Sequence, residues 1–208
     1  MMTEAHNKWF EEAEIDGKRF EHLSKFMCDD FTVPVELVRE QWPLWTPDEQ
    51  LGFASAFSVR AKLSDNDRAV LDFLLENGTP RIWGAITLLV VNHLDRKRAL
   101  DFLLKRVSDR DEPLCNYYQA LTALAAPECA PLLAEALERH RRDIDFHPSL
   151  QNWTDQFFYL DYLSCSAALF KITGQEEYRT NLKKMLEHSD ETIREMVRMV
   201  SDTRGISI

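Results

Sequence analysis

The sequence predicts an all-α protein, a right-handed α-α superhelix of stacked helical hairpins. Apolar residues recur with a period near 3.6 residues along the 208-residue chain, and no stretch alternates cleanly with the period of two that half-buried strands show. The chain has only 6 glycines, and most of its 8 prolines stand where a helix would begin. An all-β chain of this length would need more turn residues, so these observations favour helices throughout.

The composition is that of a folded protein rather than of a disordered chain. Hydrophobic residues make up 45% and charged residues 29% of the sequence, and the chain is long enough to bury a sizeable core as a single domain over residues 1–208. Residues 1–20 contain no apolar leader, and no apolar run approaches the length of a bilayer span. We therefore expect a cytoplasmic protein with no membrane partner. The widely spaced cysteines are typical of buried free thiols: Cys28, Cys115, Cys129 and Cys165.

The charge is acidic and unevenly spread. The formal net charge is −10, from 25 basic and 35 acidic side chains. Most of the acidic surplus lies in residues 1–93, whereas residues 94–145 are close to neutral. An acidic chain repels phosphate backbones at long range, so a nucleic-acid partner is disfavoured and a protein partner is favoured.

Helix-start signals and apolar spacing divide the chain into successive helices. Thr46 and Glu49 have the spacing of a capping box, and Pro47 stands at the first position of the helix that follows. One or two further helices are expected before residue 34. From there on, the expected helices cover residues 34–41, 47–63, 66–76, 80–94, 96–107, 112–125, 128–141, 153–172, 176–188 and 191–200.

Self-similarity indicates repeats rather than a simple bundle. The segment Val70–Leu75 recurs 29 residues later as Ala99–Leu104, and Pro131–Leu137 is a looser third copy. The first helices of successive pairs start about 33 to 41 residues apart, which is the range of two-helix solenoid repeats.

The junctions between these pairs carry a family resemblance. Residues 186–194 are similar to the turn between HEAT repeats, in which an apolar helix end is followed by a short acidic turn, a β-branched residue and an arginine. Residues 75–85 match this turn at Pro80 and Ala85, and residues 107–114 keep its acidic turn without the arginine. The chain thus resembles the HEAT-repeat family of ARM/HEAT α-solenoids over residues 46–200, and these motifs specify a fold class rather than an activity.

The resemblance implies an organisation as well as a fold. One hairpin of amphipathic helices cannot bury its own apolar face, so each hairpin must stack on the next and the ends need polar caps. We expect capping helices over residues 1–45, about four helix pairs over 46–188, and a capping helix with a polar tail over 189–208.

Basic side chains in the middle helices are the first candidates for binding. Arg98 and Lys105 are seven residues apart and share one helix face, near Asp101. Arg139 and Arg142 lie in a later basic cluster. In two-helix solenoids the second helix of each pair usually lines the concave surface, so these residues predict a mixed-charge groove for a protein partner. The alternative interpretation is an ordinary solvated helix face.

Trp42 and Trp45 flank a proline in a predicted connector. Exposed tryptophans anchor protein interfaces, so the pair is a candidate binding site. Burial against the first repeat is the favoured alternative, because tryptophan usually finds burial.

A different function would use Trp153 and Asp161. Asp161 lies within an almost continuous aromatic and apolar stretch, and a buried carboxylate there could act as a catalytic acid or base. The chain also resembles the small HEAT-like DNA-repair glycosylases, which act on alkylated bases through an aromatic and acidic cleft. The charge argues against that function. An outward-facing Asp161, or one that binds a neighbouring arginine, is the favoured interpretation.

The longest predicted connector, residues 142–152, carries Asp143, Asp145 and His147 at alternate positions. These side chains could ligate a metal ion, but no second cluster supplies further ligands, so a solvated loop is favoured. Phosphate-binding loops, zinc spacings and nucleophile motifs are absent from the sequence, and we expect neither a cofactor nor a metal.

These patterns favour a non-catalytic module that binds one protein partner on its helical surface. A bacterial toxin-immunity or accessory protein is the more specific hypothesis, because the acidic N-terminal half could mask a basic toxin surface. The DNA-repair glycosylase is the alternative, and the oligomeric state is left open.

Overall fold

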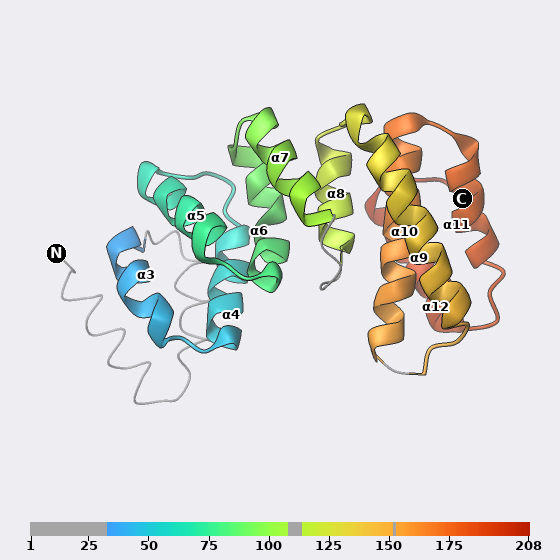
Figure 1. Ribbon diagram of the computed structural model, residues 1–208, viewed down its shortest axis with the longest axis horizontal. Coiled ribbons are helices and arrows are strands. Elements are labelled where there is room, and N and C mark those ends of the chain that lie inside the picture. Colours follow the sequence, from blue (N-terminus) through green and yellow to red (C-terminus); the bar gives the residue numbers. More distant parts are fainter. Residues whose placement is uncertain (1–32, 108–113, 152) are drawn as a thin grey trace. The chain divides into compact units, whose positions relative to one another are not determined.

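The computed structural model describes residues 33–107, 114–151 and 153–208, and the regular structure in these segments is entirely helical (Figure 1). The predicted all-α class is therefore confirmed for this part of the chain. The helices expected before residue 33 and the expected helix start at Glu112 lie outside the described residues. The chain divides into two compact units, residues 1–94 and 95–208, and each is described by itself.

The first unit is built from short helices with strong local start signals. The predicted capping box is present: the Glu49 N–H donates to Thr46 Oγ1 at 3.3 Å, and the Thr46 N–H donates to Glu49 Oε2 at 2.7 Å. Gln50 adds a side-chain hydrogen bond to the Trp42 carbonyl at 2.9 Å. The elements are α3 (Val35–Gln41), the 3-10 helix η1 (Trp42–Leu44), α4 (Pro47–Ser58), α5 (Asp65–Asn77) and α6 (Pro80–His93).

Helix α4 ends at Ser58, five residues before the predicted end at Leu63. A second capping box starts the next helix, because Ser64 and Asp67 exchange hydrogen bonds at the beginning of α5. The same Asp67 carboxylate is buried and binds Arg60 at 3.1 Å. Arg60, two residues after the end of α4, is thus joined to the first turn of α5.

The second unit is organised around one central helix, α10, which packs against α8, α9, α11 and α12. Nine consecutive residues of α10, from Asp161 to Leu169, are buried. A helix buried on every side is apolar all round rather than amphipathic. The elements of this unit are α7 (Arg96–Val107), α8 (Cys115–Ala123), the 3-10 helix η2 (Pro127–Cys129), α9 (Ala130–Phe146), α10 (Trp153–Thr173), α11 (Glu176–Met185) and α12 (Glu191–Thr203).

Helix α9 is longer than predicted and corrects the interpretation of residues 142–152. It continues to Phe146, so Asp143 and Asp145 lie on a helix and not in a loop. Ile144 is buried one turn beyond the buried His140. The buried side of α9 therefore continues through the polar segment that had suggested a connector.

Among the helices that the structure describes, none combines the length and the hydropathy that crossing a bilayer requires.

Candidate functional site

Helix α7 presents a stripe of alternating charge, which we call the α7 stripe: Lys97, Arg98, Asp101 and Lys105. All four residues are exposed, whereas the opposite side of α7 is buried. Residues three, four and seven apart lie on one helix face. The stripe therefore places one acidic group between basic groups at steps of one helical turn, and it brings the predicted binding residues Arg98 and Lys105 onto one exposed face.

Other basic residues hold α7 in the second unit. Arg96 donates through Nη1 to the Leu124 carbonyl at the end of α8, and its Nη2 binds Glu128 Oε1 at 2.9 Å. At the other end of α7, Arg139 of α9 donates to the Val107 carbonyl at 3.3 Å. Both ends of α7 are thus joined to neighbouring elements, and the stripe lies on a fixed helix.

The N-terminal end of α7 departs from the usual charge preference of helices. The Asp95 Oδ1 accepts the Arg98 N–H at 2.9 Å and so caps the helix, but the first turn itself is basic and has no acidic residue. Acidic residues occupy the first turn of α4, α5, α11 and α12, whereas α6, α8 and α9, like α7, have none there. Basic groups at the positive end of the helix dipole lower stability. The C-terminal end of α7 follows the preference, because Lys105 and Arg106 lie in its last turn.

The remaining predicted basic residues lie on α9. Arg142 is exposed, and the neighbouring Arg141 lies 3.9 Å from Glu138. Arg139 is half-buried and makes the hydrogen bond to Val107 that holds α7. Of these predicted binding residues, Arg142 is therefore open to a partner, while Arg139 has a structural contact within the unit.

Trp42 and Trp45 are buried in the first unit, at 7% and 5% exposure. Their ring centroids are 5.9 Å apart, and Phe53 packs against both, at 6.3 Å from Trp42 and 5.2 Å from Trp45. The favoured interpretation of the pair as core residues is confirmed, and neither ring is presented to a partner.

Asp161 is buried in the second unit at 7% exposure. The interpretation that it faces outward or binds an arginine is wrong: its Oδ1 accepts the backbone N–H of Leu114 at 2.8 Å. Leu114 is the N-cap of α8 and has no side-chain cap of its own, so the carboxylate from α10 replaces one. Burial raises the pKa of Asp161 to about 7, although the N–H groups of Leu114 and Cys115 act in the opposite direction.

Further polar side chains of the core bind one another or the backbone. The Tyr118 hydroxyl lies 2.6 Å from His140 Nε2, and the Cys165 thiol donates to the Leu133 carbonyl at 3.2 Å. Burial, with a smaller contribution from the Arg139 cation, lowers the pKa of His140 to about 4, and burial raises the pKa of Cys165. His140 and Cys165 are therefore neutral near pH 7, and their contacts lie inside the core. Trp153 is the first residue of α10, and its side chain lies outside the described part.

Asp143, Asp145 and His147 do not converge on one point. Asp143 lies 3.8 Å from His140, Asp145 is exposed, and His147 lies 3.4 Å from Asp155 and stacks on Phe158 with ring centroids 4.9 Å apart. Within the described segments, no group of three or more His, Cys, Asp or Glu side chains could hold a metal ion.

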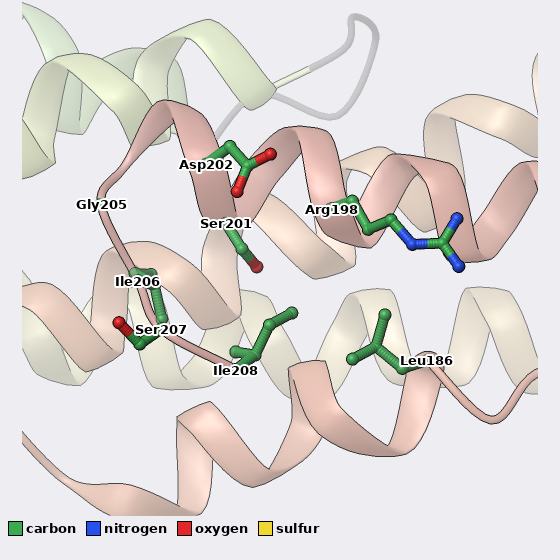
Figure 2. A pocket seen from close by; sticks show the side chains of 8 residues that line it. All are labelled: Leu186, Arg198, Ser201, Asp202, Gly205, Ile206, Ser207 and Ile208. Carbon is green, nitrogen blue, oxygen red and sulfur yellow. The ribbon is translucent and has the colours of Figure 1, made fainter.

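An open groove of about 660 Å³ lies along the C-terminal end of α12 and was not predicted (Figure 2). Arg198 lies at its rim, where its Nη1 binds Glu191 at 3.0 Å, and the buried Ser201 hydroxyl lies on its α12 side. The sequence signal was Gly205 followed by Ile206, which end α12 in a Schellman motif and fold the tail back. The lining residues are Leu186, Arg198, Ser201, Asp202, Gly205, Ile206, Ser207 and Ile208.

The groove has mixed chemistry. Its charged residues, Arg198 and Asp202, are of opposite sign, and Leu186, Ile206 and Ile208 are apolar. Two serines, Ser201 and Ser207, also line it. Comparison with protein-family models, with curated proteins and with solved structures finds no match for this chain.

The buried Asp161 makes a prediction about the pH dependence of stability. Its pKa is higher in the folded protein than the ordinary value near 4, so the unfolded chain ionises first as the pH rises. The native carboxylate therefore costs stability progressively between about pH 4 and pH 7, by up to about 4 kcal/mol at about 1.4 kcal/mol per pKa unit. Asp161→Asn should remove this cost.

The measurement is urea unfolding of both proteins across this pH range. The free energy of unfolding of Asp161→Asn, relative to that of the unsubstituted protein, should rise from pH 4 to pH 7. His140 has the opposite sign, because its lowered pKa makes the folded protein lose stability as the pH falls from about 6.5 to 4. In the unsubstituted protein the effects of Asp161 and His140 oppose each other, whereas Asp161→Asn keeps only that of His140 and should become more stable from pH 4 to 6.5. Parallel pH profiles for the two proteins would contradict this account.

The basic first turn of α7 makes a second prediction. Arg98→Glu and Lys105→Glu reverse the same charge beside Asp101, but at opposite ends of the helix dipole. The first should be the more stable variant by about 1 kcal/mol, because a carboxylate is favoured at the start of a helix and disfavoured at its end. Urea unfolding at low salt measures the difference. Equal stabilities would show that the dipole plays no part here.

Proposed function

We propose that this chain is a non-catalytic module that binds one protein partner on its helical surface. The observation that carries the proposal is the α7 stripe, an exposed and patterned set of charges on a helix that is held at both ends. Charged groups arranged in this way contribute partner choice and register more than raw affinity.

The location of the titratable groups supports a binding function over a catalytic one. Asp161, Tyr118, His140 and Cys165 are all buried, and the contacts described for them are to other protein groups. A general base or nucleophile must come within hydrogen-bond reach of its substrate. The glycosylase alternative gains no support, since its required carboxylate, Asp161, is buried against the Leu114 N–H.

The proposal includes the architecture of a right-handed HEAT-like superhelix. Helices α10 and α11 form one predicted hairpin and pack on each other, and successive hairpins meet within each unit where α5 packs on α6, α7 on α8 and α9 on α10. Short turns between packed neighbours are typical of helical hairpins, which must stack to bury their apolar faces.

A toxin-immunity or accessory protein is the specific form of the proposed function that we favour. Its support is the net charge of −10, which suits the masking of a basic partner at a distance, with the α7 stripe as a local exception of opposite sign. Co-expression with a candidate basic toxin tests this form, and unchanged toxicity across such candidates would count against it.

Affinity capture tests the module itself. The tagged full chain is mixed with lysate of its own source cells at ~150 mM salt, where weak contacts with nucleic acid are screened. We expect one protein to be retained in a stoichiometric amount and to survive nuclease treatment. Retention of nucleic acid in place of a protein would overturn the proposal.

A further inference from the structure

We propose that the α7 stripe recognises a segment of the partner protein whose charges alternate in the complementary order: acidic, basic, acidic. This inference rests on the proposed function and names the chemistry of the partner. Carboxylates of the segment would lie opposite Arg98 and Lys105, and a cation opposite Asp101.

The spacing of the stripe defines what fits it. An α-helix rises about 1.5 Å per residue, so Arg98 and Lys105 lie about 10 Å apart along α7 with Asp101 between them. A partner helix with acidic residues seven positions apart and a basic residue between them matches this spacing. Lys97, one turn from Asp101, accommodates a further carboxylate beside the first.

Asp101 is the residue that lets the stripe discriminate between a protein segment of alternating charge and a uniform polyanion. A nucleic acid or an anionic membrane presents negative charge at every step, so it meets repulsion at Asp101 in the middle of the stripe. The net charge of −10 adds a long-range repulsion of the same sign. A partner with a cation at this position gains an attraction there instead.

The rest of α7 supports a recognition surface rather than a merely solvated face. Arg96 and Arg139 fix the two ends of the helix, so the backbone beneath the stripe does not have to be ordered when the partner binds. Basic residues also occupy the first turn, where helix stability favours acidic ones. Arg98 thus opposes the helix dipole, Lys105 in the last turn agrees with it, and both stand on a rigid support.

The experiment uses two synthetic helical peptides of about 20 residues with one composition. The patterned peptide carries three glutamates and one lysine in the complementary order, and the scrambled peptide places them out of register. Poly-L-glutamate, a DNA duplex and vesicles containing phosphatidylserine are the uniform polyanions. Binding to the full chain is measured by fluorescence anisotropy, or by co-sedimentation for the vesicles, at ~50 mM salt, where surface charges act most strongly.

We expect the patterned peptide to bind at least about threefold more tightly than the scrambled one, since each exposed ion pair contributes a factor of up to about five. The double variant Arg98→Glu with Lys105→Glu should lose at least about tenfold in affinity for the patterned peptide. The control, Lys183→Glu with Lys184→Glu, makes the same charge change at exposed positions of α11 and should bind like the unsubstituted protein.

The sign of the Asp101→Asn effect decides the inference. We expect this variant to bind the patterned peptide about threefold more weakly and poly-L-glutamate more tightly. Tighter binding of every probe would identify a general polyanion surface, and equal binding of the two peptides would also overturn the inference. Repeating the affinity capture with the double variant separates the two proposals: a protein partner that is still retained leaves the interaction module standing and removes the α7 stripe from it.

Discussion

The burial of α10 on every side is the constraint on which the second unit depends. Between Asp161 and Leu169, where α8, α9, α11 and α12 surround it, α10 has no face on which polar side chains can meet water. Asp161 and Cys165 therefore bind backbone groups of neighbouring segments, at Leu114 and Leu133. The first of these bonds also defines where α8 begins, because α8 has no side-chain cap of its own. Polar groups that resemble catalytic residues in the sequence thus hold helices together in the structure.

The proposed function uses the surface instead. Asp161, His140 and Cys165 are buried, whereas the charges of α7 are exposed on a helix that Arg96 and Arg139 hold at both ends. The stripe has a rigid support, with Arg98 opposing the helix dipole and Lys105 agreeing with it. A rigid support is expected of a surface that serves recognition.

Local signals in the sequence predicted much of the fold, and contacts between distant residues account for the errors. Helices α6 and α7 begin at the predicted residues, because a proline and an Asp95 cap mark their starts. The end of α4 was misjudged: the helix ends at Ser58, and Arg60 in the segment that follows binds Asp67 of α5. Asp161 was misjudged because its partner, Leu114, is 47 residues away and is a backbone group, which no side-chain pattern reveals. The shared face of Arg98 and Lys105 could be predicted, because it follows from their spacing along one helix. The groove beside α12 could not, because it forms only when the C-terminal tail folds back on the helix.

Zero-length crosslinking of the captured complex tests the central claim most directly. A carbodiimide joins an amine only to a carboxylate in contact with it, so it reports ion pairs without a spacer. The account predicts that Lys97 and Lys105 become linked to aspartate or glutamate residues of one segment of the partner. Links to the partner confined to lysines outside α7, such as Lys171, Lys183 or Lys184, would contradict it.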